Sequence, residues 1–160
     1  MNRTSILGLV ICAMVLLIAC EQQRDPCLEP KTVSMRVVAK QAVNDSTSVD
    51  TLLASPVWIA IDSQFAIKFP DRAAHFGLLL SPLADSCRWA IQPDSAVLAF
   101  DTLTFHYNRK LLFLSNACGF TYHFSLREVR STRHQVDSVR LNNTDVNENA
   151  TAPEHVQIFF

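Results

Sequence analysis

Apolar and polar residues alternate along most of the chain. Successive side chains of a β-strand point to opposite faces of its sheet, so a period of two is typical of half-buried strands. The longest alternating segments are residues 32–40, 101–107 and 120–129. In these segments one face carries Val33, Met35, Val37 and Ala39, then Leu103, Phe105 and Tyr107, then Phe120, Tyr122, Phe124 and Leu126. Shorter strands are predicted at residues 57–62, 76–80, 87–91, 110–115, 136–141 and 155–160.

Turn-forming residues separate the predicted strands. Pro, Asp and Asn break the pattern in the sequences FPDR, QPDS, YNRK and LNNTD. Short strands at a spacing of roughly 8–12 residues predict a sandwich or a barrel. We therefore expect residues 31–160 to form a single antiparallel β-sandwich of about eight strands, of immunoglobulin-like or transthyretin-like type. Residues 39–55 could hold either a loop or a short helix.

The end of the chain suggests one alternative fold. Val156, Ile158 and Phe160 alternate with other residues and end in Phe, which is similar to the last strand of outer-membrane β-barrels. Strands of such barrels need about 9–11 residues to cross the membrane, and many of the strands predicted here are shorter. The sandwich is therefore the preferred prediction.

The N-terminal residues predict a signal peptide. Ile6 to Ala19 is an uninterrupted apolar segment that follows the basic residue Arg3. As a helix it would reach roughly 21 Å, short of the roughly 30 Å of a bilayer's hydrocarbon core. The core of a signal peptide fits this length better than a membrane-spanning helix does. We assign residues 1–19 to the signal peptide.

The sequence LIAC at residues 17–20 resembles the bacterial lipoprotein signal. In that signal, cleavage precedes the cysteine and the cysteine carries the lipids, so the resemblance implies lipidation at Cys20. Residues 20–30 are polar and have no apolar period, which predicts a flexible tether. Glu21 stands where an Asp commonly retains proteobacterial lipoproteins in the inner membrane. We expect a lipid-anchored protein of the outer membrane, on its periplasmic or its outer face.

The charge balance gives no support for nucleic-acid binding. The chain has 14 Lys and Arg against 15 Asp and Glu, a formal net charge of −1. It has no strongly basic block of the kind that follows a nucleic-acid backbone. Basic residues gather only at Arg109-Lys110 and in the series Arg127, Arg130 and Arg133. We interpret that series as a solvated strand edge.

Three cysteines follow the predicted lipidation site. Cys27, Cys87 and Cys118 would lie in an oxidising compartment, where disulfides persist. Because three is odd, at most one disulfide forms among them, and spacing alone allows any of three pairings. The chain has no CxxC or HxxxH motif, and its five His residues are dispersed. We therefore expect no metal site and no cofactor.

Three segments occur together in this chain: DPCLEP at residues 25–30, DTLTFHYNRKLLFLSNACGFTYHF at 101–124 and HVQIFF at 155–160. This combination resembles a family of small Bacteroidota lipoproteins catalogued only as a domain of unknown function. Cys27 and Cys118 stand at the two cysteines of that family, while Cys87 has no counterpart, so the resemblance implies a Cys27–Cys118 disulfide. It implies no activity. It makes an outer-membrane β-barrel protein a candidate partner, beside the membrane itself.

The chain contains none of the common catalytic motifs. There is no G-x-S-x-G, no HExxH and no glycine-rich phosphate loop. His106 and His123 fall on the strand faces opposite the aromatic ones, and Asp101 could form a dyad with either, although the spacing does not require it. Trp58 and Trp89 could stack on a sugar, but isolated aromatic residues are more often part of a core.

The expected function is a non-catalytic binding or accessory subunit. The alternative is a periplasmic enzyme that acts on envelope glycan or peptide. A cleft that brings together His106, His123 and acidic groups would favour the enzyme. An exposed apolar patch or a free strand edge would favour a protein partner.

Asp precedes Ser or Thr at many positions in this chain. The sequences DST, DTL, DSA, DTL and DSV resemble the acceptor motif for O-glycosylation of exported Bacteroidota proteins. The resemblance implies five candidate acceptors: Ser46, Thr51, Ser95, Thr102 and Ser138. The structural alternative is that Asp-Ser and Asp-Thr begin turns and β-segments. Thr102 is the poorest candidate if its strand is central in a sheet.

Overall fold

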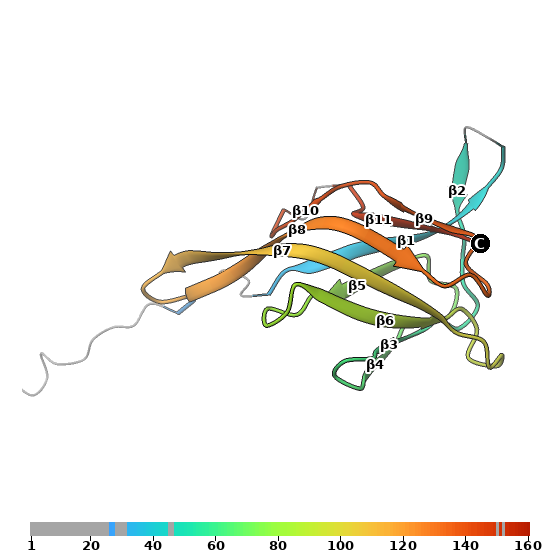
Figure 1. Ribbon diagram of the computed structural model, residues 1–160, viewed down its shortest axis with the longest axis horizontal. Coiled ribbons are helices and arrows are strands. Elements are labelled where there is room, and N and C mark those ends of the chain that lie inside the picture. Colours follow the sequence, from blue (N-terminus) through green and yellow to red (C-terminus); the bar gives the residue numbers. More distant parts are fainter. Residues whose placement is uncertain (1–25, 28–31, 45–46, 150, 152) are drawn as a thin grey trace, which may run out of the picture.

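Two β-sheets pack face to face in the computed structural model, which describes residues 26–27, 32–44, 47–149, 151 and 153–160 (Figure 1). Within these residues the first sheet consists of β1 (Ser34–Ala42), β2 (Ser48–Asp50), β5 (His75–Leu79), β9 (Ser138–Leu141) and β11 (Val156–Phe159). The second sheet has the order β10-β8-β7-β6-β3-β4. Its strands are β3 (Val57–Ala60), β4 (Phe65–Lys68), β6 (Ser86–Gln92), β7 (Asp101–Ser115), β8 (Gly119–Ser131) and β10 (Asp145–Val146). The predicted all-β, sandwich-like architecture is confirmed.

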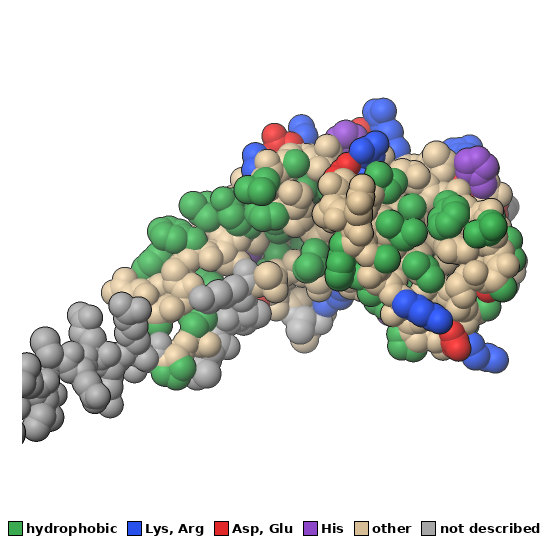
Figure 2. All heavy atoms as spheres, turned by 90° about the horizontal axis from the view of Figure 1, so that it is seen from below, with side chains coloured by type: hydrophobic (Ala, Val, Ile, Leu, Met, Phe, Trp, Pro, Cys, Tyr) green, Lys and Arg blue, Asp and Glu red, His purple; other side chains and the backbone are tan. Residues whose placement is uncertain are grey.

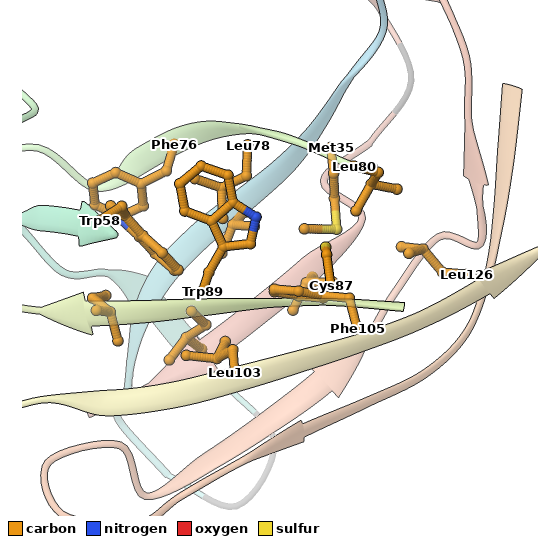
Figure 3. Close-up of a cluster of buried hydrophobic side chains, with 14 of the residues drawn as sticks. Met35, Trp58, Phe76, Leu78, Leu80, Cys87, Trp89, Leu103, Phe105 and Leu126 are labelled. Atoms are coloured by element: carbon orange, nitrogen blue, oxygen red, sulfur yellow. The ribbon is translucent and has the colours of Figure 1, made fainter. Parts of the chain in front are cut away.

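The hydrophobic core lies between the two sheets. It is built from the alternating positions that the sequence predicts, including Met35, Val37, Leu103 and Phe105, all of which are buried. Figure 3 shows side chains of the first sheet facing those of the second; the labelled ones are Met35, Trp58, Phe76, Leu78, Leu80, Cys87, Trp89, Leu103, Phe105 and Leu126. Trp58 and Trp89 are both buried in this core, which confirms the structural interpretation of these residues.

The strands differ from the prediction in their number and in the direction of one pairing. The described residues form eleven strands instead of about eight, because β2, β4 and β10 are short strands that lie among turn residues. The pairing of β1 with β11 is parallel, from Val37 with Val156 to Lys40 with Phe159, so the sheets are not purely antiparallel. The two strands come from opposite ends of the chain, where no tight turn forces them to run antiparallel.

The predicted break at YNRK is wrong. β7 continues through these residues as one strand of 15 residues that pairs with β8 along its length. The buried Tyr107 donates its hydroxyl proton to the carbonyl of Ser81, and Arg109 reaches Asp85 and the carbonyl of Pro82. These contacts hold the polar segment extended, and it contains no Gly or Pro that would interrupt the strand.

Candidate functional site

The β7–β8 hairpin extends past the rest of the sandwich (Figure 1). Its pairing runs from Leu103 with Ser131 to Ser115 with Gly119. In the described part of the chain, β6 pairs with β7 only as far as His106, and β10 pairs with β8 only at Phe124 and Ser125. The far end of the hairpin is therefore a two-stranded projection at one end of the molecule.

The projecting end carries the core face of the hairpin into solvent. Leu111 pairs with Tyr122, and Phe113 pairs with Phe120, so these four side chains share one face. Alternation places them on the same face as the buried Tyr107 and its partner Leu126. Leu111, Phe113 and Phe120 are 53%, 56% and 60% exposed, whereas Tyr122 is half-buried and packs against the edge of the core. We call these four residues the apolar tip; Figure 2 shows hydrophobic side chains along this projection.

The apolar tip is an organised surface. The rings of Phe113 and Phe120 lie 5.3 Å apart in a tilted, edge-type contact. No charged residue occurs in the sequence between Lys110 and His123. Contiguous exposed apolar side chains of this kind make the tip a candidate site for contact with a membrane or another macromolecule.

A disulfide fastens the N-terminal part of the chain to this projection. Cys27 is bonded to Cys118, which lies in the turn between β7 and β8. The same turn is closed by a hydrogen bond from the amide of Cys118 to the hydroxyl of Ser115, and Gly119 follows with a φ of 74° that favours glycine. The structure thus contains the pairing that the family resemblance implies. Cys20 and most of the predicted tether lie outside the described residues.

Asp101 holds a loop and does not form a dyad with His106 or His123. Its fully buried carboxylate accepts hydrogen bonds from the hydroxyl of Thr132 and from the three consecutive backbone amides of residues 134–136, at 2.6–2.9 Å. Burial opposes ionisation, but these hydrogen bonds outweigh it and lower the pKa of Asp101 to about 2. Asp101 therefore ties the segment after β8 to the start of β7.

The described histidines are placed on separate elements. His155 is buried: its Nδ1 accepts the amide proton of Arg36, and its Nε2 lies 3.1 Å from the carbonyl of Asp145. Burial lowers its pKa, which fits a neutral ring that joins β1, β10 and β11. His123 pairs with Glu148, and His106 lies opposite Glu128 across the strands. The structure does not bring His106, His123 and Asp101 together in one cleft.

Cys87 is a buried free thiol on β6. Burial raises its pKa to about 11, so the reactive thiolate is disfavoured. The described residues contain no grouping of three or more His, Cys, Asp or Glu side chains that could hold a metal ion. They also contain no helix long and apolar enough to cross a membrane.

The candidate glycosylation sites differ in their accessibility. Ser95 and Ser138 are exposed, whereas Thr102 is half-buried on the central strand β7. The hydroxyl oxygen of Thr51 is buried. Ser46 lies outside the described residues. Ser95 and Ser138 are thus the most accessible of the candidate acceptors that the structure describes.

A shallow groove lies at the other end of the molecule from the apolar tip. It has a volume of about 590 Å³ and lies between the β1–β2 turn and strands β9 and β11. The guanidinium of Arg140 lies over the ring of Phe159 on its wall, 5.5 Å from the ring centre. A stacked cation and an aromatic ring can bind planar, anionic or sugar-like groups. Sequence reasoning did not find this groove, because its parts come from strands about 100 residues apart.

These features define an all-β, two-sheet domain with a disulfide-tethered hairpin at one end. The profile of a family of unknown function (DUF6452) matches residues 34–160, and the chain belongs to this family. The match begins at the first residue of β1 and includes both sheets. No curated protein and no solved structure matched the chain.

Proposed function

We propose that this protein is an outer-membrane-anchored lipoprotein whose β-sandwich has a non-catalytic binding or accessory role. One observation supports the proposal most strongly. The disulfide joins Cys27, seven residues after Cys20 of the lipoprotein-like signal, to the apolar end of the domain. A domain held by lipids at one end presents its other end to the envelope space.

Three buried ionisable residues of the domain support a non-catalytic role. Asp101, His155 and Cys87 are buried, and the first two have structural hydrogen-bond partners. In the described part of the chain, the surfaces open to a partner include the groove beside Arg140 and the edge strands β2 and β4. An edge strand can accept a strand of a partner protein, and an outer-membrane β-barrel protein is the partner we propose.

The anchor is tested by expressing the full chain with its own N-terminus in a Gram-negative bacterium. We expect the wild type to partition into detergent and to have an intact mass equal to residues 20–160 plus acyl chains. Cys20→Ala should lose both the acyl mass and the cleavage, while Cys87→Ala should retain both. A wild-type protein with no acyl mass would disprove the anchor.

The accessory role is tested by chemical cross-linking in the native organism, followed by purification of the protein and mass spectrometry. Recovery of one barrel protein in stoichiometric amount would support the accessory role. Recovery of the lipoprotein alone from intact membranes would contradict it.

A further inference from the structure

Three of the four side chains of the apolar tip are exposed among the described residues, and the position of the tip in the chain identifies an occupant. We propose that the tip lies against the surface of the lipid bilayer and holds the domain upright on it. The inference rests on the proposed lipid anchor and adds a second membrane contact, made by Leu111, Phe113, Phe120 and Tyr122.

The length of chain between the anchor and the tip supports a lipid occupant. Cys27 lies seven positions after Cys20, and even a fully extended chain spans at most about 25 Å between them. The disulfide ends this tether at Cys118, in the turn of the hairpin. Acyl chains attached at Cys20 would therefore keep the apolar tip within one tether length of the bilayer at all times. A partner protein would have to compete for the apolar tip with the bilayer, which the tether keeps at a high effective concentration.

The chemistry of the tip fits the interfacial region of a bilayer. Tyr is enriched at that depth, where its apolar ring and its polar hydroxyl are both accommodated, and Phe and Leu supply apolar area that can enter the boundary with the acyl chains. Lys110 is exposed directly beside the uncharged segment, where an ammonium group can reach lipid phosphates. Arg109 next to it is held by Asp85 and belongs to the body of the domain.

The geometry also limits how deep the tip can lie. Backbone groups need hydrogen-bond partners, and a two-stranded ribbon cannot supply them along its outer edges in hydrocarbon. The tip is therefore expected at the level of the headgroups and the first acyl carbons, within about 5–10 Å of the boundary. The rest of the sandwich remains in water.

The inference is tested with the full lipidated protein, purified from membranes and reconstituted into vesicles of phosphatidylethanolamine and phosphatidylglycerol. Phe113→Trp places a reporter on the tip, and Phe120→Trp provides a second reporter on the paired strand. Leu98→Trp is the matched control, because Leu98 is also an exposed apolar residue but lies before β7, at the opposite end of that strand. Wild-type emission from the two buried tryptophans is subtracted.

We expect the tip reporters to shift to shorter wavelength and to be quenched by lipids brominated near the headgroup, while the Leu98→Trp reporter stays at its solvent value. Flotation of the vesicles reports the anchor separately. A protein that floats with the vesicles but shows unquenched tip reporters would overturn the inference and leave the anchor intact. A wavelength shift that depends on protein concentration without lipid quenching would overturn it in favour of a second copy. A protein that does not float would disprove the anchor, and the inference with it.

Discussion

Single buried polar residues fix the irregular parts of this fold. Asp101 and His155 each lie where one strand meets a loop from a distant part of the chain. A buried polar group is tolerated only when its hydrogen bonds are made, so each of these side chains specifies one arrangement of its loop. Both residues should therefore affect the free energy of unfolding. Asp101 stabilises the fold in its charged form and His155 in its neutral form, so both contributions decrease as the pH falls.

Replacing Asp101 by Asn should destabilise the protein by about 2–4 kcal/mol, because an amide can accept fewer of the hydrogen bonds that the carboxylate accepts and adds donors with no partner. Urea unfolding at neutral pH measures the change. Asp137→Asn is the matched control: Asp137 is an exposed carboxyl in the same part of the chain, and its replacement should change stability by less than about 0.5 kcal/mol. Equal effects of the two changes would show that the Asp101 hydrogen bonds are not stabilising.

Asp101 also predicts acid sensitivity. Its folded pKa is about 2, below the ordinary value of 3.8. The stability that it contributes is fully present above pH 3.8 and is lost as the pH falls toward 2. Unfolding midpoints measured between pH 5 and pH 2 should therefore fall more steeply for the wild type than for Asp101→Asn.

As the pH falls, the stability contributed by His155 should begin to decrease at a higher pH than that contributed by Asp101. Burial lowers its pKa below the ordinary value of 6.5, so the unfolded chain takes up a proton that the folded protein does not. Its contribution is complete above pH 6.5 and declines as the pH falls below that value. Protonation would also end the hydrogen bond that Nδ1 accepts from Arg36. Between pH 7.5 and 5, the stability measured by urea unfolding should fall less with decreasing pH in His155→Gln than in the wild type. Identical slopes in the two proteins would contradict this.

At the scale of elements, the disulfide joins the described part of the tether to the turn between β7 and β8. Cys27→Ser and Cys118→Ser should each destabilise the protein by about 4 kcal/mol, since the bond closes a loop of 91 residues in the unfolded chain. Thermal unfolding under oxidising conditions measures this. The double variant should be no less stable than either single one, because one bond is lost in every case.

Cys87→Ser is the control for the disulfide variants. Cys87 lies in the core beside the hydroxyl of Tyr107, where a serine hydroxyl can find a polar neighbour. We expect a change of about 1 kcal/mol or less. A larger effect from Cys87→Ser than from Cys118→Ser would contradict the structural role of the Cys27–Cys118 bond.

The strands that the sequence predicts well are those whose alternation is long. The segments 32–40 and 101–107 form β1 and the first half of β7, with the predicted faces buried. The parallel pairing of β1 with β11 could not be predicted, because it depends on contacts between the two ends of the chain. YNRK was misread for a related reason, since Tyr107 and Arg109 are satisfied by the distant β5–β6 connection.

The alternation of apolar and polar residues could not predict the apolar tip. Phe113 and Phe120 follow the alternation as faithfully as Phe105 and Phe124 do, yet only the second pair is buried. Alternation reports which side chains share a face, and it cannot report where the opposing sheet ends. The cysteines were the signal that pointed to this region, because the family resemblance implied a bond to the turn beside it.

At the scale of the whole molecule, the apolar tip and the C-terminus lie at opposite ends of the long axis (Figure 1). β7 alone has 15 residues and spans roughly 50 Å of that axis. If the tip rests on the bilayer, the groove beside Arg140 and Phe159 faces away from it. A ligand would then enter the groove far from the lipid surface.

This orientation can be measured with a fluorescent donor placed after Phe160 and acceptor dyes in the headgroups of the vesicles. We expect weak energy transfer from this position, because an upright domain keeps its C-terminus several tens of ångströms from the acceptors. The same donor placed at Phe113 should transfer strongly. Cys118→Ser releases the tether from the tip, so the domain can tumble about the anchor and transfer from the C-terminal donor should rise. Strong transfer from the C-terminus of the wild type would mean that the domain lies flat, with the groove close to the lipids.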